Sequence, residues 1–77
     1  MPLTIEIRFY ASLKPLEPPG AGAYAIEPGT TVGRLLEALG VPLEKIKLVF
    51  VDGRRAPLET PLTGGERLGV FPPVGGG

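Results

Sequence analysis

The sequence predicts an α+β fold in which one main helix packs on a mixed sheet of four to five strands. Two observations carry this prediction. Apolar and polar residues alternate near both ends of the chain, as in strands with one buried face, and one segment between them repeats its apolar residues at helical spacing. The chain has 77 residues, enough for one small domain, so both patterns are expected to build the same core.

The first part of the chain contains two predicted strands. Residues 3–10 alternate strictly until the last pair and form a half-buried strand. Residues 24–27 form a short second strand. The intervening residues 11–22 hold three prolines and two glycines, which favours a connecting loop over a regular element.

A helix is predicted over residues 32–39. Its apolar residues recur at i, i+3, i+4 and i+7 and therefore share one face; they are Val32, Leu35, Leu36 and Leu39. Thr30 or Thr31 can cap the amides that open the helix, and Gly40 is expected to end it.

Three further strands are predicted in the second part of the chain. A single helical turn at residues 43–46 precedes a strand at residues 47–51, and the Asp52-Gly53 turn leads into a short edge strand at residues 54–57. After a turn at residues 63–66, the last strand covers residues 67–71. The order ββαβββ predicts a roll of the ubiquitin type, a β-grasp, with the first and last strands side by side at its centre.

The composition excludes several classes of function. Eight acidic and eight basic residues leave a formal net charge of zero, without a run of like charge that would bind nucleic acid. No apolar run approaches the roughly 20 residues that span a bilayer. We therefore expect no nucleic-acid partner and no membrane partner.

Cysteine and histidine are both absent. Their absence removes the usual zinc ligands, the thiol nucleophile and the side chain that best serves as a base near neutral pH. We expect no metal, no cofactor and no side-chain catalysis by this chain alone. Without a disulfide framework or a signal-peptide pattern, a cytoplasmic location is expected. The lack of Asn and Gln, with prolines in the predicted loops, indicates a thermophilic source.

The candidate reactive group is the α-carboxylate of Gly77. We expect a β-grasp domain at residues 1–71, followed by a flexible tail at residues 72–77 that ends in glycines. Glycine has no Cβ, so such a tail can thread a channel too narrow for side chains. Pro72 and Pro73 fix φ and lack an N–H, so they end the strand and stiffen the base of the tail. Taken alone, however, the glycines also fit an ordinary loose terminus.

Several segments resemble the sulfur-carrier proteins of the β-grasp fold, and most of all the small subunit of molybdopterin synthase. These are residues 7–11, 31–36, 51–54 and 61–66, together with the final Phe71-Pro72-Pro73-Val74-Gly75-Gly76-Gly77. The final segment is the most specific, because Phe-Pro-Pro-Val before a glycine pair is typical of that subunit.

The resemblance implies a cycle on the carboxylate of Gly77. A ubiquitin-activating-like enzyme adenylates it with ATP, and a sulfur donor converts the adenylate to a thiocarboxylate. The thiocarboxylate gives its sulfur to a precursor in the large subunit of molybdopterin synthase, so this chain would be the sulfur-donating small subunit of an enzyme complex. All acid, base and metal roles would then lie in the partners.

The residues expected to contact these partners lie in the last strand, in the tail, at Tyr10 at the end of the first strand and at Arg54 and Arg55 in the hairpin. Those of the last strand and tail are Phe71, Pro72, Pro73, Val74, Gly75 and Gly76. Of these, Phe71 fits the core equally well, whereas Pro72, Pro73 and Val74 lie beyond the strand and are expected to bind a groove. Tyr10, near Val70 or Phe71, is either part of an apolar patch or an ordinary surface tyrosine. Arg54 and Arg55 are either solvated or face an acidic patch of the activating enzyme.

The chain departs from the family pattern in three places. Residues 12–23 are rich in proline and lack the Arg-Glu-Leu-type segment that commonly follows the first strand, which predicts a loop of different shape. Arg55 stands near where relatives can carry an apolar residue that contacts partners, so its charge weakens such a contact or marks a different partner. Gly75 replaces a small residue and is expected only to add flexibility.

Two other classes of function stay open. In the first, the chain is a ubiquitin-like modifier whose Gly77 forms isopeptide bonds with lysines. In the second, it is an interaction module whose tail has no chemistry. Within the sulfur-carrier class, the thiamine, cysteine and tRNA-thiolation pathways use the same type of carrier, and the double proline only favours molybdopterin.

Overall fold

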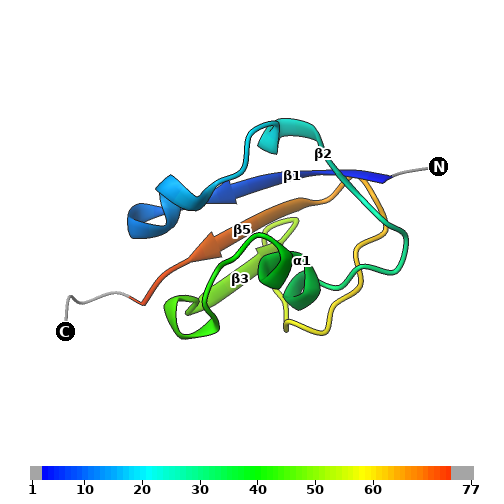
Figure 1. Cartoon of the computed structure of the whole chain (residues 1–77). Coiled ribbons are helices and arrows are strands. Elements are labelled where there is room, and N and C mark those ends of the chain that lie inside the picture. Colours follow the sequence, from blue (N-terminus) through cyan, green and yellow to red (C-terminus); the bar gives the residue numbers. More distant parts are fainter. Residues whose placement is uncertain (1–2, 74–77) are drawn as a thin grey trace.

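The computed structural model describes residues 3–73, which form a five-stranded mixed sheet and one α-helix (Figure 1). The strands are β1 (Leu3–Phe9), β2 (Tyr24–Ile26), β3 (Leu48–Val51), β4 (Arg54–Arg55) and β5 (Arg67–Phe71). They lie in the order β2-β1-β5-β3-β4, with β1 and β5 parallel and the other neighbours antiparallel. The predicted ββαβββ order, the α+β class and the central pairing of the first and last strands are confirmed.

One face of the sheet is buried under α1 (Val32–Ala38), and the core lies between them. The predicted apolar face of the helix supplies three buried side chains, and Leu39 packs against the same core half-buried. The sheet contributes the inward residues of its strands: Ile5, Ile7, Phe9, Ile26, Val49, Leu68 and Val70. The other face of the sheet, called the outer face below, carries the alternate residues of the same strands.

The start of α1 is fixed by side-chain and loop oxygens. The Thr31 side chain is the N-cap and accepts a hydrogen bond from the Arg34 N–H at 3.2 Å. The N–H groups of Val32 and Gly33 bond the carbonyls of Thr60 and Leu58, at 3.0 and 2.8 Å. These bonds satisfy amides that have no partner inside a helix.

The end of α1 follows the predicted glycine stop. Gly40 has a φ of +80°, and its N–H bonds the Glu37 carbonyl, while the Val41 N–H bonds the Leu36 carbonyl, both at 3.0 Å. This pattern of two bonds around a left-handed residue is a Schellman motif.

The proline-rich stretch differs from the prediction, because it contains two 3-10 helices, η1 (Ala11–Leu16) and η2 (Ala21–Ala23). Both helices are short, as 3-10 segments usually are, and the only proline inside them is Pro15 in η1. Leu13 is buried in the core and anchors η1. The Glu17 carboxylate accepts the Phe9 N–H at 2.9 Å and so ties the stretch to β1. The predicted turn at residues 43–46 is present as η3 (Leu43–Lys45).

Candidate functional site

The chain leaves the sheet at the end of its central strand, β5. The last two residues of β5 are held from both sides: the Tyr10 N–H donates to the Val70 carbonyl at 3.1 Å, and the Lys47 N–H donates to the Phe71 carbonyl at 2.8 Å. Because β1 runs parallel to β5, η1 begins at this same end of the sheet (Figure 1). The point where the predicted tail begins is therefore fixed by backbone bonds to two neighbouring segments.

Pro72 is buried, although the sequence analysis expected it to lie beyond the strand and to bind a groove. The alternation of β5 continues one residue beyond the strand, so that Leu68, Val70 and Pro72 are all buried while Pro73 is exposed. Proline lacks the N–H needed for the sheet ladder, but its ring can still face the core. The predicted contact residues Val74, Gly75 and Gly76, and the reactive Gly77, lie outside the described residues.

Three aromatic side chains cover the outer face at this end of the sheet. The rings of Tyr10 and Phe71 stack with centroids 4.2 Å apart and planes inclined by 2°. Phe50 meets Phe71 edge to face, with centroids 5.5 Å apart. Phe71 thus belongs to the outer face, half-buried, whereas Val70 is fully buried and adds nothing to it. We call Tyr10, Phe50 and Phe71 the aromatic surface.

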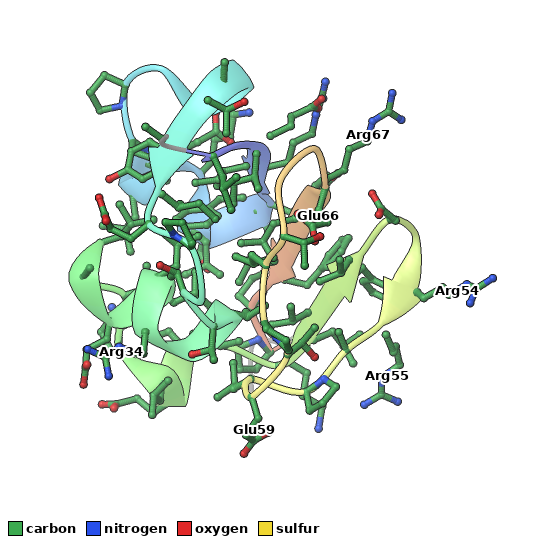
Figure 2. All side chains as sticks on the ribbon, turned by 90° about the vertical axis from the view of Figure 1, so that its right-hand side faces the viewer. Arg34, Arg54, Arg55, Glu59, Glu66 and Arg67 are labelled. Atoms are coloured by element: carbon green, nitrogen blue, oxygen red, sulfur yellow. The ribbon has the colours of Figure 1, made fainter. Side chains whose placement is uncertain are left out.

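A charged cluster adjoins the aromatic surface along β1 and β5. The Glu6 carboxylate lies 2.7 Å from Arg8 Nε and 3.7 Å from Arg67 Nε. The hydrogen bond from Arg8 lowers the pKa of Glu6 below its ordinary value of 4.5. Figure 2 shows Arg67 extending away from the sheet, so that its guanidinium group remains accessible.

Arg54 and Arg55 do not form one paired surface. They lie opposite Val51 and Phe50 in the β3–β4 hairpin, and neighbouring strand residues alternate between faces. Figure 2 shows their side chains pointing in different directions. Both are exposed. Their contact with an acidic patch of the activating enzyme stays a prediction.

Sequence reasoning missed part of this site, namely Phe50 and the Glu6, Arg8 and Arg67 cluster. Each stands at an alternate position of a correctly predicted strand, and that periodicity is the signal that places it on the outer face. Their proximity depends in addition on the register between β1, β5 and β3, which the sequence alone did not give.

The described residues 3–73 contain no group of three His, Cys, Asp or Glu side chains that could hold a metal ion. In the same part of the chain, every helix is too short or too polar to cross a membrane.

The fold and the exit of β5 define a ubiquitin-like β-grasp protein. Residues 2–75 match the family model described as Mut7-C ubiquitin, and the chain belongs to that family. A comparison with curated proteins finds no match.

Three solved structures show the same fold over nearly the whole chain. Small archaeal modifier protein 1 (SAMP1) of Haloferax volcanii is 27% identical, with a TM-score of 0.68 over 94% of this chain and 99% of that one. A Pyrococcus furiosus protein assigned as molybdopterin converting factor subunit 1 is 24% identical, with a TM-score of 0.64 over 94% and 99% of the two chains. In a Helicobacter pylori complex of molybdopterin-converting factor subunits 1 and 2, the matched chain is 21% identical, with a TM-score of 0.57 over 97% and 100%. The predicted β-grasp resemblance is thereby confirmed.

Proposed function

We propose that this chain is a sulfur carrier whose Gly77 carboxylate is activated as an acyl-adenylate and then converted to a thiocarboxylate. The observation that supports this most is the way β5 leads into the Phe71-to-Gly77 segment, with Val70 and Phe71 hydrogen-bonded from both sides. Because the end of β5 is rigid, a partner enzyme can bind the domain there while its active site reacts with the segment that follows.

The proposed chemistry needs no side chain of this protein. A carboxylate oxygen attacks the α-phosphorus of ATP, and pyrophosphate leaves. Hydrosulfide supplied by the sulfur donor then attacks the acyl carbon, AMP leaves with the electron pair of the broken C–O bond, and loss of the S–H proton leaves the thiocarboxylate. Activation is required because a carboxylate is a poor acyl donor, and the enzyme that binds this chain supplies the acid, base and metal.

The proposed partners are an adenylating enzyme and a larger subunit that accepts the sulfur. The aromatic surface beside the exit of β5 is suited to such contacts, since exposed aromatic rings are enriched at interfaces. The solved complex of molybdopterin-converting factor subunits 1 and 2 supports a large-subunit partner for this fold. The Phe71-Pro72-Pro73-Val74 segment favours molybdopterin as the pathway.

A ubiquitin-like modifier is the second candidate, favoured by the fold match to a protein named as a modifier, SAMP1. Both functions begin with the same adenylate and differ in the nucleophile that attacks it, sulfur or the amine of a lysine. Gly77 linked to lysine side chains in extracts of the source organism would support the modifier; its absence alongside a thiocarboxylate would support the carrier.

Adenylation is tested by ATP–pyrophosphate exchange with the adenylating enzyme of the same genome. The natural chain is expected to stimulate exchange, and a variant that lacks Gly76 and Gly77 is expected not to. Equal exchange with both chains would contradict the assignment of the reactive carboxylate.

A further inference from the structure

A groove borders α1 on the side that faces away from the sheet. It is lined by the start of α1 with the loop at Leu58 and Glu59, and by residues 40–43, which follow the helix. Leu58 lies at the start of α1, because its carbonyl accepts the Gly33 N–H at 2.8 Å. Leu43 is 58% exposed, the most exposed large apolar side chain of residues 3–73. Leu43 and Leu58 thus stand at opposite ends of one groove.

Opposite charges stand side by side along the same groove. Arg34 and Glu37 are three residues apart in α1, so they are neighbours on the helix surface, and both are exposed. Figure 2 shows Arg34 and Glu59 both pointing away from the domain. Within the described residues 3–73, none of these three side chains forms an ion pair. Charges of both signs are therefore available to another molecule.

The order of these groups along α1 makes the surface complementary to itself. Two copies can pack with α1 antiparallel, about a two-fold axis that passes between Arg34 and Glu37. Each arginine then lies opposite the glutamate of the other copy. The same axis brings Leu43, at one end of the groove, towards Leu58 at the opposite end of the other copy's groove. A two-fold interface repeats every contact, so it contains two ion pairs and two apolar contacts of this kind.

We propose that the helix surface, defined by Arg34, Glu37, Leu43 and Leu58, joins two copies of this chain into a dimer. Because α1 covers the face of the sheet opposite the outer face, the dimer leaves both aromatic surfaces and both exits of β5 accessible. One particle then presents two copies of the Phe71-to-Gly77 segment. The dimer does not depend on the chemistry proposed for Gly77.

The mass of the natural chain in solution tests the dimer. Sedimentation velocity at rising concentration is expected to show a shift from one chain to two. One short helix from each copy makes a small interface, so we expect a Kd between about 1 μM and about 1 mM.

A leucine variant tests the groove. Leu43→Ser is expected to weaken the association at least about tenfold, because symmetry removes two apolar contacts at once. The matched control is Leu16→Ser, since Leu16 is also exposed (39%) but lies in η1, outside the groove. Its association is expected to equal that of the natural chain. Urea unfolding of both variants checks that each remains folded.

An exchange of charges tests the orientation of the two copies. Arg34→Glu gives a chain with two acids on the helix surface, and Glu37→Arg gives a chain with two bases. Each variant alone is expected to remain monomeric, because like charges then face each other across the axis. An equimolar mixture of the two variants is expected to form a one-to-one dimer, because every acid then faces a base. Pairing of these residues within one chain cannot produce that recovery.

Two results would overturn the dimer. In the first, the natural chain keeps the mass of a single chain up to about 1 mM. In the second, it dimerises, but Leu43→Ser and the two charge variants dimerise equally well, so that the contact lies on another surface. Neither result bears on the sulfur carrier, which is tested by pyrophosphate exchange and by the mass of the chain after sulfur transfer.

Discussion

Phe71 is the residue that joins the end of the sheet to the outer face. Its ring contacts both Tyr10 and Phe50, while the next residue, Pro72, is buried. The sequence left Phe71 undecided between core and interface because alternation along β5 says which residues share a face, but not which aromatic partners are opposite.

The stack of Tyr10 on Phe71 predicts an energetic coupling between them. In a double-mutant cycle of Tyr10→Ala and Phe71→Ala, urea unfolding is expected to give a coupling of about 1 kcal/mol. Phe71→Ala alone is expected to cost about 2 kcal/mol, less than a fully buried phenylalanine, because its ring is half-buried. Strictly additive effects would show that the rings do not interact in solution.

Glu66 is expected to make stability depend on pH. Its carboxylate accepts hydrogen bonds from the Thr63 N–H and hydroxyl, both at 2.8 Å, and from the Gly64 N–H at 2.7 Å. Figure 2 shows Glu66 turned over this loop, away from Arg67. Burial alone raises the pKa of Glu66, but the hydrogen bonds outweigh it, so the folded pKa lies below 4.5.

A lowered folded pKa means that the stabilisation is present above the unfolded pKa and is lost as the pH falls through the folded one. The free energy of unfolding is therefore expected to be constant well above the unfolded pKa of about 4.5 and to fall as the pH drops through that value and through the lower folded pKa. Glu66→Gln is expected to be less stable by about 1 kcal/mol at neutral pH and to lose less on acidification. An unchanged pH dependence in Glu66→Gln would contradict this role.

At the scale of elements, the sequence was most informative where structure depends on near neighbours. Helix α1, its stop at Gly40 and the Asp52-Gly53 hairpin were all predicted, since caps and tight turns are local. The 3-10 helices in residues 11–23 were missed because Leu13 is buried in a core made by residues distant in the sequence. No local sequence pattern predicts that contact.

Thr31 is expected to contribute about 1 kcal/mol through its cap on α1. Thr31→Ala removes the acceptor for the Arg34 N–H, whereas Thr31→Ser keeps it, so only the alanine variant should lower the thermal midpoint clearly. Equal losses in the two variants would assign the effect to the threonine methyl group instead.

At the scale of the whole molecule, the site is made by chain segments far apart in sequence. Tyr10 follows β1, Phe50 lies in β3 and Phe71 lies in β5, and they meet only because β1 and β5 pair in parallel at the centre of the sheet, with β3 beside β5. Sequence reasoning gave the central pairing from the fold class, but a shift of register would have placed different residues together. The proposed chemistry was suggested by the family resemblance of the Phe71-to-Gly77 segment. The fold adds that the start of this segment is held by backbone hydrogen bonds at the end of β5.

The most direct test of the account is the intact mass of the chain after incubation with its adenylating enzyme, ATP and a sulfur source. We predict an increase that corresponds to the replacement of one oxygen by one sulfur, assigned to Gly77 by fragmentation. The truncation that lacks Gly76 and Gly77 should show no such increase. An unchanged mass of the natural chain, measured with an enzyme that is active in pyrophosphate exchange, would contradict the proposal that this protein carries sulfur.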